Sequence, residues 1–138
     1  MKRVVLAGAL VLAVTSCSNG SSKSSTPQVT ATPCPTVGPS ASTALPADVP
    51  PVDGTAYEYS AQGKTLVWFF SVDGSGSDLP SLRDAYDAKL TAKGYKILDT
   101  DAEAGSESES SFTGAHDGTT NFRPLCDGKV VFRLKLTE

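Results

Sequence analysis

The sequence predicts an α+β fold, in which one helix covers a mostly antiparallel sheet. Three observations lead to this class. A run of large apolar residues, 66–70, stands between two glycines and indicates a strand. Residues 78–93 carry apolar side chains at spacings of three and four, which is typical of an amphipathic helix. Alternating segments separated by Asp-Gly pairs then predict about four more strands. The expected order is ββα followed by these strands, a two-layer sandwich.

The first two strands are expected to form a hairpin. Residues 55–61 alternate in character, and Gln62-Gly63 is a suitable turn into the apolar run. An unbroken apolar run predicts a strand that is buried on both faces, which places Trp68 in the core. A single helix covers only one face of a sheet, so an apolar patch on the other face would indicate a partner site. Four side chains are candidates for that patch: Tyr57, Tyr59, Val67 and Phe69.

The predicted helix has one apolar stripe and readable ends. Its stripe consists of Leu79, Leu82, Tyr86 and Leu90. The other side is polar and is expected to include Asp87. Ser77 or Asp78 is suited to cap the N-terminus, Pro80 fits the first turn, and Gly94 fits the left-handed position after the last turn.

The chain after the helix predicts short strands separated by polar turns. We expect strands at residues 95–99, 111–115, 119–125 and 129–137. Residues 100–110 are acidic and polar and are predicted to be a solvated loop. Asp117-Gly118 and Asp127-Gly128 are predicted hairpin turns. In the last strand, alternate residues from Val130 to Leu136 are apolar and should face the core.

The N-terminus has the features of a targeting segment. Lys2 and Arg3 precede an apolar stretch, residues 4–14, that is too short to cross a bilayer, which needs ~20 residues. Such a stretch is typical of a secretory signal. The following Val14-Thr15-Ser16-Cys17 resembles the lipobox of bacterial lipoproteins. The resemblance implies that the signal is removed before Cys17 and that Cys17 carries lipid. The alternative is an ordinary secretory signal with an incidental cysteine.

Composition divides the chain into three parts. Residues 1–16 are the expected signal peptide. Residues 17–46 are the lipidated N-terminus and a tether that is rich in Ser, Thr and Pro and is expected to be disordered. Residues 47–138 are one small domain. The net charge of −3, with no basic cluster or phosphate-binding loop, argues against nucleic acid as a partner.

The remaining cysteines, Cys34 and Cys126, are expected to form a disulfide. Thiols outside the cytoplasm tend to oxidise, and an even number favours a pair. The bond would attach the middle of the tether to the last hairpin. In the alternative, Cys126 is buried as a small apolar residue and Cys34 is free or bridges two molecules.

No pattern in the sequence predicts a catalytic, cofactor or metal site. The loop 73–78 has alternating oxygen side chains, as calcium loops do, but lacks glycine at the sixth position and glutamate at the twelfth. Carboxylates of residues 99–109 could act on glycosidic bonds only if two faced each other across a cleft. His116 is the single histidine, and it adjoins a predicted turn. Trp68 and its aromatic neighbours would stack on sugars only at an exposed strand.

We therefore expect a non-enzymatic binding or interaction module without a cofactor. It would be anchored through the lipid on Cys17 to the extracytoplasmic face of the cell membrane, where an envelope protein could be its partner. Two alternatives remain open: a carrier or sensor of a small apolar ligand or lipid, held between sheet and helix, and a hydrolase of wall polymers.

Overall fold

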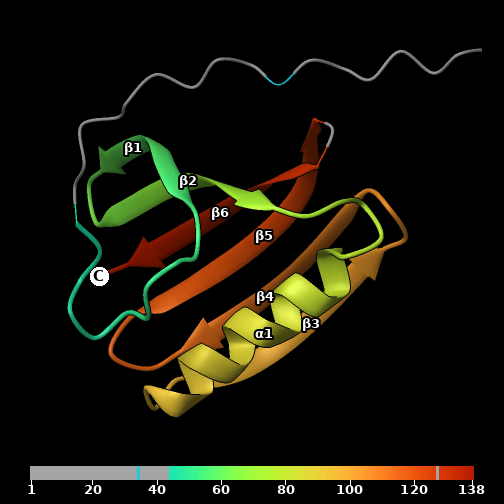
Figure 1. The fold of residues 1–138 in the computed structure, drawn as a ribbon. Helices are drawn as coiled ribbons and strands as arrows, with labels where there is room; N and C mark the ends of the chain where they lie inside the picture. The colour runs from blue at the N-terminus through green and yellow to red at the C-terminus, as the bar shows by residue number, and fades with distance from the viewer. Residues whose placement is uncertain (1–33, 35–43, 127) are drawn as a thin grey trace, which may run out of the picture.

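The computed structural model describes Cys34, residues 44–126 and residues 128–138, and Figure 1 shows their arrangement. Two strands, β1 (Thr55–Gln62) and β2 (Thr65–Asp73), precede helix α1 (Leu79–Ala92). Four strands follow: β3 (Lys96–Glu103), β4 (Glu107–Thr113), β5 (Asp117–Cys126) and β6 (Lys129–Thr137). The described strands form one sheet in the order β1-β2-β6-β5-β4-β3, and every neighbouring pair is antiparallel. The predicted α+β class, a mostly antiparallel sheet with a helix, is confirmed.

The last strand joins the two halves of the sheet. β6 lies between β2 and β5, so it pairs with the first hairpin on one side and with the later strands on the other. Its apolar residues alternate, as predicted, and successive side chains of a strand point to opposite faces. Val130, Phe132, Leu134 and Leu136 are all completely buried. The centre of the sheet is therefore built by the end of the chain.

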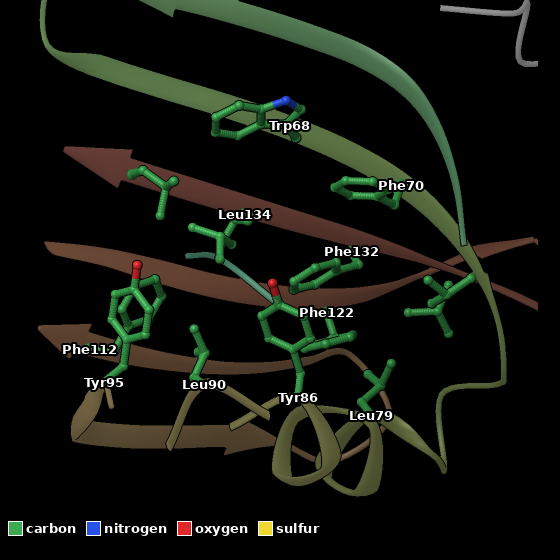
Figure 2. Close-up of a cluster of buried hydrophobic side chains, with 14 residues drawn as sticks. Trp68, Phe70, Leu79, Tyr86, Leu90, Tyr95, Phe112, Phe122, Phe132 and Leu134 are labelled. Atoms are coloured by element: carbon green, nitrogen blue, oxygen red, sulfur yellow. The ribbon is translucent and has the colours of Figure 1, made fainter. Parts of the chain in front are cut away.

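Helix α1 covers the β3-β4-β5 half of one sheet face, which we call the inner face. Leu79 and Leu90 are completely buried, and the ring of Tyr86 lies 4.7 Å from that of Phe132. Figure 2 shows these helix side chains pointing toward the aromatic residues of the sheet. Leu82, the fourth residue of the predicted apolar stripe, packs against this core but is only partly buried.

A non-helical segment covers the other half of the inner face. This segment, residues 44–54, is called the strap here. Val49 of the strap is buried in the core, and Leu45 and Val52 pack against it. Two polar contacts fasten the strap to the helix. The Tyr86 hydroxyl donates to the Pro50 carbonyl at 3.0 Å, and Lys89 pairs with Asp53 at 2.5 Å.

The prediction that β2 is buried on both faces is wrong. Trp68, Phe70 and Val72 are buried on the inner face, but Val67 and Phe69 on the other face are only half-buried. Within the described residues, neither the helix nor the strap packs on this second face, which we call the open face. The aromatic run therefore supplies both a core side and an accessible side.

The acidic stretch predicted to be a loop is a β-hairpin. β3 and β4 continue through it and turn at residues 104–106, where Gly105 has φ +73°. The polar composition of this stretch predicted a loop because the inner face of β4 carries Ser108 and Ser110 instead of large apolar residues. Small side chains fit there because the helix packs directly on β4.

Asp117-Gly118 is not the predicted turn but part of β5, and the turn lies at residues 114–116. Gly118 is required for packing. A Cβ at this position would lie 2.5 Å from the ring of Phe112 and 2.4 Å from the Lys135 carbonyl oxygen. Phe112 faces Gly118 across the strand pair, so the missing side chain makes room for its ring. At the second predicted turn, Gly128 has φ +69° between β5 and β6.

Both helix ends lie near the predicted positions, but the N-terminal cap differs. Asp78 occupies the N-cap position, yet its side chain makes no capping hydrogen bond. Instead its carboxylate accepts hydrogen bonds from the Ser75 amide at 2.8 Å and the Ser75 hydroxyl at 2.7 Å. Pro80 lies in the first turn, and Gly94 has φ +91° after the last. No helix within the described ranges is long and apolar enough to span a membrane.

A disulfide links Cys34 to Cys126, with 5.0 Å between their Cα atoms. Cys126 is the last residue of β5, next to the turn into β6. The bond therefore attaches a residue from before the domain to the central hairpin of the sheet. The lipobox, Cys17 and the tether residues 18–33 and 35–43 lie outside the described residues, whereas the last part of the predicted tether, residues 44–46, belongs to the strap.

Removing this disulfide should destabilise the domain. The two cysteines are 92 residues apart, and the chain-entropy estimate for a loop of that size is ~4–5 kcal/mol, an upper value. We expect a Cys34→Ala/Cys126→Ala variant to lose up to this free energy of unfolding in denaturant titrations. Peptide mapping of the wild type without reductant should recover the linked pair. Recovery of both cysteines as separate alkylated peptides would contradict the bond.

Candidate functional site

The open face carries polar and charged side chains in rows that cross the strands. Strand register aligns one residue from each neighbouring strand. The central row, from β3 to β2, contains Asp101, Glu109, Asn121, Arg133 and Phe69. The row has an acidic end on β3 and β4, a cation on β6 and an aromatic ring on β2.

A second row runs beside the first. It contains Asp99, Ser111, Thr119, Lys135 and Val67, again in order from β3 to β2. Carboxylates thus gather on β3 and β4, while the two cations are consecutive outward residues of β6. This separation of charge across one face is the main electrostatic feature of the surface.

A groove of about 360 Å³ lies over these two rows. Its polar lining includes Asp101, Glu109, Arg133 and Lys135. A neighbouring groove of about 390 Å³ shares Ser111, Thr119 and Lys135 with the first, so the two are continuous. Leu98 lines this second groove and is 57% exposed. A register shift between Ile97 and Asp99 brings Leu98 to the open face.

The two cations of the groove have no ion-pair partner among the described residues. For Arg133, the Nε atom is also buried and has no hydrogen-bond acceptor in that part of the chain. A buried donor without an acceptor costs free energy. The uncompensated charges of Arg133 and Lys135 can stabilise an anion that enters the groove.

The acidic end of the face contains like charges directly across the strand pair. Asp101 faces Glu109, an arrangement that destabilises a sheet by itself. Asn121 offsets part of the cost by donating to Glu107 at 2.5 Å and to Glu109 at 3.1 Å. Burial by itself would raise the pKa of Glu107, but the Asn121 hydrogen bond and the charge of Arg123 lower it. The Asp101 carboxylate has no ion-pair partner in the described chain, although Arg83 donates to the Asp101 backbone carbonyl at 3.0 Å.

A second cavity lies between the strap and the helix on the inner side. It has a volume of about 290 Å³. Val52 comes from the strap, Leu82 and Ala85 from the helix, and Phe132 from the sheet. The Lys89–Asp53 ion pair connects the two walls. The arrangement forms a small apolar cleft with a charged rim.

His116 contacts the strap. Its Nε2 atom lies 3.2 Å from a carboxylate oxygen of Asp48, which also accepts a hydrogen bond from the Tyr95 hydroxyl at 2.9 Å. That hydrogen bond is the main cause of the lowered pKa of Asp48. Burial and the same hydrogen bond raise the pKa of Tyr95 to about 12. Within the described contacts no serine or cysteine hydroxyl or thiol reaches His116, so the group fastens the strap to the sheet.

Asp87 was expected on the solvent side of the helix, and this prediction is wrong. The residue is only 8% exposed, and its carboxylate accepts a hydrogen bond from the Ser110 hydroxyl at 2.7 Å. Ser110 lies 2.6 Å from the hydroxyl of Thr120, which is completely buried. Burial raises the pKa of Asp87, while the Ser110 hydrogen bond opposes the change. Asp87 follows Tyr86 of the apolar stripe. Helical periodicity alone does not assign a polar residue at such a position to the core.

The loop considered for calcium holds its carboxylates in other contacts. Asp73 pairs with Lys129, and Asp78 accepts hydrogen bonds from Ser75. No group of three or more potential ligands for a metal ion occurs among the described residues. The structure therefore gives both aspartates a structural partner within the protein.

The apolar patch expected on the open face is present in part. Phe69 lies there, and its ring centroid is 6.1 Å from that of Tyr57. Tyr59 instead belongs to the inner face, where its ring lies 5.1 Å from Trp68. Trp68 is buried, as predicted, and so is not available for stacking on sugars. The alternation of Arg133 and Lys135 with the apolar residues of the last strand predicts that both face away from the core, but it did not identify them as site residues.

No known family model matches the chain, and no similar curated protein or solved structure was found.

The buried carboxylate of Asp87 should reduce stability as pH rises. Its folded-state pKa is raised, so the folded protein retains a proton that the unfolded chain loses above its ordinary pKa of 3.8. The contribution of Asp87 to stability is therefore greatest below pH 3.8 and declines as pH rises to the folded pKa. Asp87→Asn keeps an oxygen acceptor for Ser110 but removes this titration. We expect its unfolding free energy, relative to wild type, to increase across that pH window in urea titrations.

Asp87→Ala is the matched variant that removes the acceptor as well. It leaves the Ser110 hydroxyl with one partner fewer in a buried position and should cost about 1–3 kcal/mol. A pH-independent difference between Asp87→Asn and wild type would show that Asp87 has an ordinary pKa.

Proposed function

We propose that the protein is a non-enzymatic binding module that lipid on Cys17 anchors to the extracytoplasmic face of the cell membrane. The open face of the sheet would be its contact surface, and an envelope component its partner. In this arrangement the helix and strap form one layer, the sheet forms the second, and the outward side of the sheet is available for binding. The anchor is supported by the lipobox-like Val14-Thr15-Ser16-Cys17.

The observation that carries the proposal is the composition of the open face. It combines a continuous pair of grooves, two cations without ion-pair partners in the described chain, and the exposed side chain of Leu98. Cations without ion-pair partners beside a groove with an exposed apolar side chain favour a surface that is completed by a partner.

Site-specific crosslinking in intact cells tests the proposal. A photoreactive amino acid replaces Leu98 on the open face, and in a matched variant it replaces Ala88, an exposed residue on the helix. We expect crosslinked products from position 98 and few or none from position 88. Equal products at both positions, or none at 98, would contradict the open face as the contact surface.

The same cells test the anchor. Cys17→Ala removes the expected lipid attachment site, so the protein should leave the membrane fraction or accumulate as uncleaved precursor. Because two acyl chains hold a protein stably at a membrane, the wild type should remain membrane-bound in high salt. Mass spectrometry of the wild-type N-terminus should find lipid on Cys17. Unchanged fractionation of the variant would refute lipid anchoring at this residue.

A second function is supported by the cleft between strap and helix: carriage or sensing of a small apolar ligand. Its apolar lining and volume of about 290 Å³ are compatible with such a ligand. The Lys89–Asp53 pair at the rim would limit access until the strap moved. Anchoring would then keep a ligand carrier at the membrane surface.

Native mass spectrometry distinguishes this second function. Protein purified in detergent should retain an apolar ligand, and Ala85→Trp, which fills the cleft, should lose it. Ala88→Trp adds the same volume on an exposed helix position outside the cleft lining and should retain the ligand. If both variants retain it, the cleft is not its binding site.

A further inference from the structure

The groove on the open face contains two sets of charges that remain separate. Its cations, Arg133 and Lys135, lie on β6. Its carboxylates, Asp99, Asp101 and Glu109, lie on β3 and β4. Among the described residues, no ion pair joins the two sets.

The carboxylates have only neutral hydrogen-bond donors. Asp99 and Asp101 accept from the backbone amides of the following residues, at 3.0 and 2.9 Å. Glu109 accepts from the Asn121 amide at 3.1 Å. None of these three carboxylates has an ion-pair partner in the described chain. A positively charged group placed against them would therefore be stabilised by Coulomb attraction.

We propose that this groove binds a short peptide with free ends, a zwitterion. The peptide carboxylate would accept hydrogen bonds from Arg133 and lie near Lys135, and its ammonium group would lie against Asp101 and Glu109. A carboxylate matches the planar guanidinium fork of Arg133, which lines the groove. The inference depends on the open face being the binding surface of the proposed function.

The spacing of the strands sets the length of the ligand. Neighbouring strands are about 4.8 Å apart, so Arg133 on β6 is roughly 10 Å from Glu109 and roughly 14 Å from Asp101 along the row. The side chains shorten these spans. A free amino acid is too short to reach both charge sets, whereas a tripeptide extends to ~10 Å. Two to three residues therefore fit the separation.

The space between the charges also suits a peptide better than an acidic sugar. Ser111 and Thr119 lie between the two sets and offer hydroxyls to peptide groups. Leu98 in the continuous second groove offers an apolar surface to a ligand side chain. An acidic sugar would satisfy Arg133 but would bring only neutral hydroxyls to three carboxylates.

Titration of the full-length protein in detergent micelles tests the proposal. Trialanine is the probe, followed into the millimolar range by backbone amide chemical shifts in NMR spectra. We expect saturable shifts in β4, β5 and β6 with little change in α1. N-acetyl-trialanine and trialanine amide each lack one charge and should bind at least tenfold more weakly. Free alanine, which is too short, and glucuronate, an acidic sugar, should not saturate the groove.

Variants assign each end of the peptide. Arg133→Gln should weaken trialanine binding at least tenfold. Arg123→Gln, which removes a cation paired with Glu107 on the same face, should change it by less than threefold. Asp101→Asn should weaken binding of trialanine but not of its N-acetyl form, because the acetylated peptide has no ammonium group. Unchanged shifts elsewhere in the spectrum confirm that each variant is folded.

Three results would overturn the inference: no saturable shifts with trialanine, equal binding of capped and free peptides, or saturation by glucuronate alone. Crosslinking at position 98 and fractionation of Cys17→Ala are measured in cells without any peptide. Failure of the peptide site therefore leaves those results intact, and loss of anchoring leaves the titration interpretable.

Discussion

The pairing of β6 with both β2 and β5 is the constraint on which the structure depends. The first hairpin and the later strands are held in one sheet only because β6 lies between them. Its inward side chains, Val130 to Leu136, are completely buried and contact the core beneath the helix and the strap. The central strand is the last in the chain, so the complete core requires contacts that are distant in sequence. Such contacts close large loops, which is slow and entropically unfavourable.

The disulfide and the strap reduce that entropic disadvantage from the opposite end of the chain. Cys34 is bonded to Cys126 at the turn that leads into β6, so a residue before the domain is attached to its central hairpin. The strap then covers the half of the core that the helix does not reach. Tyr86, Lys89, Tyr95 and His116 hold it by polar contacts. If Cys17 carries the anchor, the disulfide also sets where the tether leaves the folded domain.

The two faces of the sheet have different chemical roles. The inner face is closed by aromatic packing and by the buried hydrogen bonds of Asp87, Ser110 and Thr120. The open face has separated charges around a groove and no covering element within the described residues. Because β-strand side chains alternate, each strand supplies one face and then the other. The residues that stabilise the domain and those available for binding are therefore interleaved along the same strands.

The sequence by itself determined the α+β class, the helix with its buried Leu79, Tyr86 and Leu90, the alternation of β6, and the Cys34–Cys126 pair. These follow from local periodicity and from cysteine counting. Tertiary structure decided that the acidic stretch is a hairpin, that Asp117-Gly118 lies in a strand, and that Asp87 is buried. In each case a neighbour distant in sequence changed the outcome: the close helix over Ser110, the Phe112 ring over Gly118, and the Ser110 hydroxyl beneath Asp87. The groove likewise arises only when strand register brings Asp101, Glu109 and Arg133 into one row, because no local pattern encodes which strands are neighbours.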